Sequence, residues 1–427
     1  GLKTCRRGTH RNKIRIFCHD CKKKISISHK EEKKNELLKN HLNRNSYGTL
    51  EDEKEVSKKT ACRLVNQATE ELVHSNELTQ LLKPQNYCGI LLIDGKYVPV
   101  KETGEEKEPG FVPRSAKRRG KTKKGLVAIV CIDYLTHDIP IFDVCLSENS
   151  FDMRQIFLKL KEVKYPLKIL VCDETMGQIA EVAKEVFPDV IIQICLTHYG
   201  KTIERTFVAA AAKRTYGSIQ KQLNFLGESF FILTHNLDRE KAVRLTNQMA
   251  DLEFQYGYLW HVQGLFHDLF WHVHGVLELA EWENILNESI ALMNLKNYPY
   301  AKKIKDRYRD YYEKREQITA SILHPEVDIP RTTNLIEGFN STTIELRISS
   351  IRGFKKEKHA RNYINAIILK YRFHKFKDCK TKFKTLNGKS PLEIAQPLNT
   401  LGFHFHTDDW IKFCKKLKPN FQKQPPK

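Results

Sequence analysis

The sequence predicts an α/β protein whose sheet is interrupted by a large all-helical insertion. Three observations predict this class. Residues 90–93 (Ile-Leu-Leu-Ile) are an uninterrupted aliphatic run, which is typical of a strand buried on both faces. Residues 168–198 read as strand, helix and strand, the pattern of a β-α-β unit. Residues 199–325 show helical periodicity and no strand pattern.

Composition restricts the partners of the chain. Its 427 residues are 41% hydrophobic, enough for several domains with real cores. The net charge of +21 predicts a polyanionic partner, either nucleic acid or an anionic membrane surface. No apolar run is long enough to span a membrane, which favours nucleic acid.

Cysteine usage predicts the compartment. Most of the eleven cysteines are scattered singly through apolar segments, as buried thiols are in a reducing cytosol; examples are Cys131, Cys145 and Cys172. The chain begins without an apolar signal core, so nothing indicates secretion. It also begins without Met, so we expect residues upstream. For a prokaryotic source we therefore expect a cytoplasmic, nucleoid-associated protein.

Residues 1–30 are basic, rich in strand formers, and resemble half of a zinc ribbon. Cys18 and Cys21 form a C-x-x-C knuckle, and Cys5 is a further thiol within reach of the same site. A tetrahedral zinc site needs a second pair, which Cys5, a nearby histidine or upstream residues would have to supply. The alternative is a solvated basic arm with reactive thiols.

Residues 31–84 are polar, helical and arranged like a helix-turn-helix. Ser57 can cap the second helix of this pair, which places three basic residues near the start of that helix. The predicted DNA contacts are Lys58, Lys59 and Arg63. A plain helical hairpin has the same pattern and remains the alternative.

The first candidate catalytic residue is Asp94, which ends the aliphatic run of 90–93. A carboxylate at the tip of a buried strand is costly unless it has a partner, such as a metal ion. Residues 114–124 carry seven basic residues and no acid, and they precede two further apolar strands in 125–146. This loop is either solvated or grips a phosphate backbone through Arg114, Lys117, Arg118 and Arg119.

The second candidate is Asp173, which follows the strand at 168–172. Neighbouring strands of one sheet would bring Asp94 and Asp173 together, as a shared metal requires. Glu174 is the rival, but successive strand residues face opposite sides, so only one of the two acids can join Asp94. Cys195 and His198 form a C-x-x-H that we expect to end the next strand on the same side of the sheet, with a structural or supporting role near the pocket. In the insertion, the aromatic and histidine residues of 260–282 are interpreted as packing.

The third candidate carboxylate lies beyond the insertion, on a helix that Thr or Asn of 332–334 can cap. Glu337 and Glu345 both qualify, but they are eight residues apart, about 12 Å along a helix, so one metal cannot use both. Residues 352–384 contain twelve Lys or Arg and two acids, interleaved with aromatic residues, which predicts a nucleic-acid-facing helix. The predicted contacts of this region are Arg347, Arg352, Lys355 and Lys356.

Three segments together resemble the DDE transposases of the Mutator-like superfamily, which have a ribonuclease H-like core. They are IDGKYV (93–98), CDETMGQIAEVAKEVFPDVIIQICLTH (172–198) and TTNLIEGFNSTTIELRISSIRGF (332–354). The acids are separated by 79 (173 − 94) and 164 (337 − 173) residues. The resemblance selects Asp94, Asp173 and Glu337 as the catalytic, metal-binding triad. Members of the family often have Gly after the second Asp, where this chain has Glu174.

The resemblance implies a mixed ribonuclease H-like sheet and a division of the chain. The predicted parts are a zinc-ribbon-like region (1–30), a helix-turn-helix (31–84), the first part of the core (85–200), the helical insertion (201–325), the last part of the core with a basic helix (326–385) and a tail (386–427).

The implied activity is phosphoryl transfer with two Mg²⁺ or Mn²⁺ ions, hard cations that prefer carboxylate oxygens. Water would free a 3′-OH at the element's end, and that hydroxyl would then attack target DNA. The implied partners are double-stranded DNA, as terminal repeats and target, and at least a second copy of the chain on DNA. Zn²⁺ would bind near the N-terminus. The alternatives are a domesticated, non-catalytic DNA-binding protein and another ribonuclease H-like nuclease.

Overall fold

The computed structural model is mixed α/β and mostly helical. It describes residues 4–10, 13–18, 24–54, 56–100, 125–174, 178–206, 209–230, 236–295, 301–349, 351, 354–396 and 410–421. Two compact units are present: Gly1–Lys168 with Gly177–Pro188 and Asn334–Lys427, and Ile169–Met176 with Asp189–Thr333. Among the described helices, none is both long enough and apolar enough to cross a membrane.

A five-stranded mixed sheet has the strand order β6-β5-β4-β7-β8. In the first unit, β4 (Ile90–Pro99), β5 (Gly125–Asp133) and β6 (Phe142–Cys145) are antiparallel neighbours. In the second unit, β7 (Ile169–Cys172) and β8 (Ile191–Ile194) are parallel. The predicted strands are therefore confirmed, and so is the mixed character of the sheet. The aliphatic run at the start of β4 is fully buried, as predicted for a strand covered on both faces.

One feature of β4 differs from the prediction. The strand does not end at Asp94 but continues to Pro99, so Asp94 lies mid-strand, opposite Val130 of β5. The reason is the length of β5, whose nine residues offer hydrogen-bond partners for the whole of β4. Side chains change from buried to half-buried at Asp94, which is where the aliphatic run of 90–93 ends in the sequence.

The front of the first unit is helical, as predicted. After a three-stranded antiparallel sheet of β1 (Thr4–His10), β2 (Lys13–Cys18) and β3 (Lys24–Ser28) come α1 (His29–Leu42), α2 (Tyr47–Lys54), α3 (Lys58–Glu70) and α4 (Ser75–Leu82). Ser57 caps α3, because its hydroxyl accepts the Thr60 N–H. Helix α3 packs on α1 through buried residues at helical spacing: Ala61, Leu64, Val65 and Ala68.

The remaining helices of the first unit follow the sheet in sequence or come from the C-terminal third. They are α5 (Ser150–Glu162), α6 (Ile179–Val186), α14 (Asn334–Phe339), the π-helix η1 (Asn340–Glu345), α15 (Leu346–Ile348), α16 (Glu357–Phe373), the 3₁₀ helix η2 (Thr381–Leu386), α17 (Pro391–Ala395) and α18 (Trp410–Phe421).

A buried ion pair joins three of these elements. The Arg372 guanidinium of α16 donates to both carboxylate oxygens of Asp138, at 2.8 and 2.7 Å, and neither side chain is exposed. Its remaining nitrogen donates to Ser75 and Thr79 of α4. The Tyr87 hydroxyl also donates to Asp138. This network fixes α16, α4 and the turn after β5 to one another.

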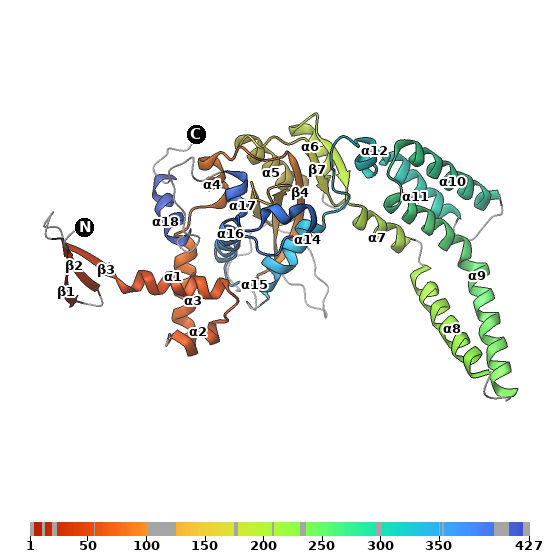
Figure 1. The fold of residues 1–427 in the computed structure, drawn as a ribbon, viewed down its shortest axis with the longest axis horizontal. Helices are drawn as coiled ribbons and strands as arrows, with labels where there is room; N and C mark the ends of the chain where they lie inside the picture. Colours follow the sequence, from red (N-terminus) through yellow and green to blue (C-terminus); the bar gives the residue numbers. More distant parts are fainter. Residues whose placement is uncertain are drawn as a thin grey trace, which may run out of the picture. The chain divides into compact units, whose positions relative to one another are not determined.

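The insertion in the second unit is all-helical in its described residues, as predicted. Figure 1 shows α8 (Ala209–Phe230) and α9 (Asn236–Trp271) running alongside each other. The other helices are α7 (Leu196–Thr206), α10 (Val276–Leu295), α11 (Ala301–Glu313), α12 (Arg315–Ile318) and α13 (Ala320–Leu323). A core of its own, including Leu259, Phe266, Phe270, Leu286 and Tyr311, holds this unit together.

The start of α4 makes the stability of the first unit depend on pH. The His74 ring caps α4 by accepting the Asn76 N–H, and it stacks on Phe142. Burial lowers the pKa of His74 from 6.5 to about 4. The unfolded chain therefore takes up a proton between pH 6.5 and 4 that the folded chain refuses, so stability falls as the pH falls through this range.

We predict that His74→Asn removes this pH dependence and keeps the cap, because Asn is a strong N-cap residue. Between pH 7 and 5 the wild type should lose about 2 kcal/mol of unfolding free energy through this group. Urea unfolding followed by circular dichroism at both pH values measures the difference. His137, whose pKa burial also lowers to about 4, still titrates in the variant, so part of the slope should remain. An unchanged slope in the variant would contradict the assignment.

Candidate active site

Asp94 is held in place within the first unit by two hydrogen bonds. One carboxylate oxygen accepts the Gly95 N–H at 2.8 Å, and the other accepts the Asn340 side-chain amide at 2.8 Å. Asn340 begins the π-helix that directly follows α14. Glu337 lies in the first turn of α14, three residues before Asn340 and therefore on the same side of the helix. Two predicted acids, Asp94 and Glu337, thus lie on elements that contact each other.

The rival acid Glu345 is engaged elsewhere. It lies at the end of the π-helix and forms an ion pair with Lys96 at 2.5 Å, and half of its side chain is exposed. A carboxylate that a lysine already neutralises is a poorer ligand for a cation. The choice of Glu337 over Glu345 stays a prediction.

Asn340 was missed at the sequence level. Its side chain is 3% exposed, and its amide oxygen has no hydrogen-bond partner among the residues that the structure describes. The available signal was its spacing of three residues from Glu337, which places both on one face of a helix. Asn340 carries a neutral amide and not a carboxylate, a thiol or an imidazole, so its residue type does not indicate a metal site.

In the second unit, Asp173 directly follows β7, as predicted. The Nε2 atom of His198 lies 3.9 Å from the Asp173 carboxylate. The prediction that His198 ends a strand is wrong. Strand β8 stops at Ile194, and His198 lies in the first turn of α7.

Cys195 links β8 to the residue that precedes α14. Its thiol accepts hydrogen bonds from the backbone and the hydroxyl of Thr333, and its own N–H donates to Cys172. Burial opposes ionisation of the thiol, but hydrogen bonds from His198 and Thr333 outweigh burial and lower the pKa of Cys195. The structural or supporting role of the C-x-x-H stays a prediction.

Glu174 faces the helical insertion. Its carboxylate pairs with Lys314, which also contacts Asp310 at 2.7 Å. The Tyr199 hydroxyl donates to the same Asp310. Asp173 and Glu174 therefore have different partners, as expected for successive residues at a strand end. Glu174 therefore contacts the helical insertion through Lys314.

The predicted DNA contacts of α3 are exposed. Lys58, Lys59 and Arg63 all lie at the surface near the start of the helix, although Lys58 is also 3.4 Å from Glu51. The loop residues Arg114, Lys117, Arg118 and Arg119 lie outside the described residues, and so does Arg352. Lys355 and Lys356 are exposed.

The interpretation of 352–384 as a nucleic-acid-facing helix is wrong for α16. This helix is largely a core helix, and its basic residues bind protein groups: Arg372 is fully buried, and Lys370 donates to Leu42. Arg347, which precedes α16, is half-buried and also donates to Leu42, so it fastens α1. A count of charges cannot tell a buried, paired arginine from a solvated one.

The predicted zinc ligands lie in or next to the N-terminal sheet. Cys5 belongs to β1 and Cys18 to β2, and their side chains, like the whole of Cys21, lie outside the described residues.

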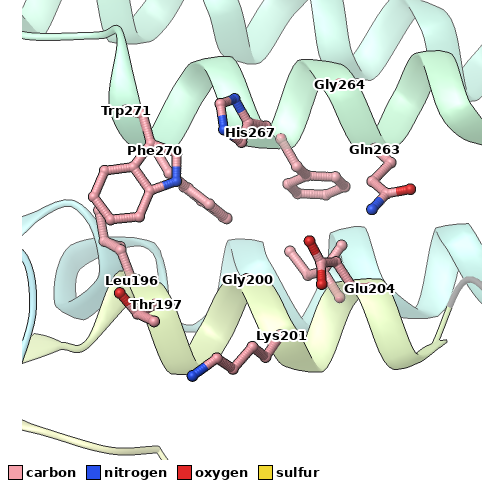
Figure 2. A pocket seen from close by; sticks show the side chains of 12 residues that line it. Leu196, Thr197, Gly200, Lys201, Glu204, Gln263, Gly264, His267, Phe270 and Trp271 are labelled. Atoms are coloured by element: carbon pink, nitrogen blue, oxygen red, sulfur yellow. The ribbon is translucent and has the colours of Figure 1, made fainter. Parts of the chain in front are cut away.

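The insertion holds a cavity and an exposed histidine cluster, neither of which involves Asp173 or His198. The cavity of about 620 Å³ lies between α7 and α9, where Figure 2 shows Glu204 and Phe270 among its lining side chains. Ligand atoms of His267, Asp268 and His272 lie within 4.8 Å of one another. Both histidines are exposed, so their interpretation as packing residues is wrong, whereas the aromatic residues Phe266 and Phe270 do pack in the core.

Comparisons with known proteins add little to this geometry. No family model matches the chain, and no match was found among curated proteins. Among solved structures, the chain is similar to one in the "Mos1 transposase paired-end complex with left transposon end", at 16% sequence identity and a TM-score of 0.17. The match covers 36% of this chain and 55% of that chain, so it spans about half of that chain's length. A likeness at this TM-score carries no argument about fold or activity.

We predict that Glu174→Gln lowers the unfolding free energy of the second unit by about 1–2 kcal/mol, because it breaks a largely buried ion pair. Three of the four tryptophans (Trp260, Trp271 and Trp282) belong to this unit, so tryptophan fluorescence during urea unfolding reports mainly on it. Glu313→Gln is the matched control, since Glu313 is 66% exposed and should change stability by less than about 0.5 kcal/mol. Equal effects of the two variants would contradict the structural role of Glu174.

Proposed function

We propose that this chain is a metal-dependent DNA transposase of the Mutator-like type, with a ribonuclease H-like core. The observation that carries the proposal is the hydrogen bond between Asp94 and Asn340. It fastens the helix that carries Glu337 to the strand that carries Asp94, so two carboxylates from distant parts of the sequence share one region of the first unit.

We infer that Asp173 is the third carboxylate. Support comes from its place directly after β7, from His198 beside it, and from the engagement of the rival Glu174 by Lys314. Cys195 contributes indirectly, because its thiol holds Thr333, the residue before α14. His198 and Cys195 would thus position Asp173 and Thr333, which both belong to the second unit.

The donor set fits Mg²⁺ or Mn²⁺. Carboxylate oxygens are the ligands these hard cations prefer, and the buried, unpartnered amide oxygen of Asn340 is a further hard donor beside Asp94. Asp94, Asp173 and Glu337 would hold the ions. Two bound ions would stabilise the attacking and leaving oxygens of an in-line displacement at phosphorus. The residues of the chain would supply orientation: Asn340 donates a hydrogen bond to Asp94, and His198 lies 3.9 Å from Asp173.

We further propose that the front of the chain binds double-stranded DNA. The basic residues Lys59 and Arg63 lie one helical turn apart on the exposed side of α3, and among the described residues neither has a recorded partner. The opposite side of α3 is buried against α1. The zinc-ribbon-like segment 1–30 would add Zn²⁺, and synapsis of two element ends would need at least two copies of the chain.

We predict that Asp94→Asn, Asp173→Asn and Glu337→Gln each reduce DNA cleavage by at least about 100-fold, since each removes a ligand whose ion stabilises the transition state by several kcal/mol. The substrate is a supercoiled plasmid that carries the gene with its native flanks, incubated with Mg²⁺ or Mn²⁺. Gel mobility of labelled duplex should show unchanged binding for all three variants.

Glu181→Gln is the control for this experiment, because Glu181 is an exposed acid on α6 and should leave cleavage unchanged. Joining of a 3′-OH oligonucleotide to target DNA separates a transposase from a nuclease that only cuts. A wild-type protein that binds DNA but never cleaves it with either metal would favour the non-catalytic, DNA-binding alternative.

We predict that the double substitution Lys59→Ala with Arg63→Ala weakens duplex binding at every sequence tested. Each phosphate contact contributes about 0.9 to the slope of log affinity against log salt, so the slope should fall by about 2. Fluorescence anisotropy of a labelled duplex at several salt concentrations measures this. Lys184→Ala, at an exposed lysine of α6, should change neither the affinity nor the slope. Equal slopes for wild type and the double variant would exclude α3 from the DNA interface.

A further inference from the structure

Asn340 leaves one polar atom without a partner, and its orientation is fixed. Asp94 can only accept hydrogen bonds when ionised, so the Asn340 amide nitrogen must be the atom that faces it, at 2.8 Å. The amide oxygen is therefore the atom that Asp94 does not contact. It is buried, and no hydrogen-bond partner exists for it among the described residues. Buried polar atoms almost always have partners, so this oxygen calls for a ligand.

The π-helix explains how Asn340 is kept on Asp94. In an α-helix, residues five apart are rotated by about 140°, so Asn340 and Glu345 would face different directions. In the π-helix, whose hydrogen bonds run from i to i+5, both face β4: Asn340 contacts Asp94, and Glu345 contacts Lys96. Asp94 and Lys96 are two residues apart and so lie on one face of the strand. The π-helix thus allows Asn340 and Glu345 to contact the same strand, β4.

We propose that Asn340 is part of the metal centre and has two roles. Its amide nitrogen positions Asp94, and its amide oxygen supplies a neutral oxygen ligand to the divalent cation held there, either to the ion itself or to one of its waters. Mg²⁺ and Mn²⁺ accept such ligands, and Mg²⁺ commonly keeps several waters. This inference rests on the proposed metal-dependent function, but its test measures metal binding without DNA and without turnover.

The test is Mn²⁺ binding to the full-length protein. The decrease of the electron paramagnetic resonance signal of free Mn²⁺ measures this binding. Asn340→Leu, which removes both atoms at similar size, should weaken binding by about 10–100-fold. Asn340→Asp keeps an oxygen on the ion's side and adds a negative charge to it; because this charge outweighs the loss of the N–H contact with Asp94, the variant should bind at least as tightly as the wild type. Ser341→Ala, at an exposed neighbour in the same π-helix, should bind like the wild type.

The two substituted variants separate the two roles. If Asn340 acted only through its N–H group, both variants would bind Mn²⁺ weakly, because Asp also lacks that donor and repels Asp94; weak binding by Asn340→Asp would overturn the ligand role. Wild-type affinity in Asn340→Leu would overturn the inference as a whole. Failure of the proposed function looks different: neither the wild type nor Asp94→Asn would bind Mn²⁺. Circular dichroism of each variant shows whether it is folded.

Discussion

The buried Arg372–Asp138 ion pair is the interaction on which the first unit depends. Taking both charges out of water is expensive, and the cost is offset only when every donor and acceptor is satisfied. That condition is met: the guanidinium binds Asp138, Ser75 and Thr79, and the Tyr87 hydroxyl completes the carboxylate. These contacts join α16, α4 and the turn that follows β5.

The ion pair is connected to the candidate site through strands β5 and β4 of the sheet. The turn that holds Asp138 begins where β5 ends, and β5 pairs with β4 along its whole length. Asp94 therefore lies on β4, whose partner strand β5 is held at its end by the Asp138 turn. The second anchor is the π-helix, which fastens Asn340 to Asp94 and Glu345 to Lys96. A site that must hold cations needs such rigid support, since its ligands repel one another when no ion is bound.

Sequence patterns predicted the strands and helices of the fold. They did not predict side-chain contacts between residues that are far apart in sequence. Aliphatic runs predicted the buried strands, and the Ser57 cap was visible because it rests on one residue and its neighbours. Arg372 was counted among surface charges, because its partner Asp138 lies 234 positions away in sequence. Asn340 was missed for the same reason, since its partner Asp94 is 246 positions away and a π-helix has no periodic signature over six residues.

The most direct test of the central claim is cleavage of the polypeptide by iron. Fe²⁺ substituted for Mg²⁺, with ascorbate and peroxide, releases hydroxyl radicals that cut the backbone beside the bound ion. We expect cuts at three places far apart in sequence: near Asp94 in β4, near Asp173 after β7, and near Glu337 in α14. Excess Mg²⁺ should suppress all three together. Cuts confined to the exposed His267–His272 cluster, or at only one of the three acids, would contradict a shared metal centre.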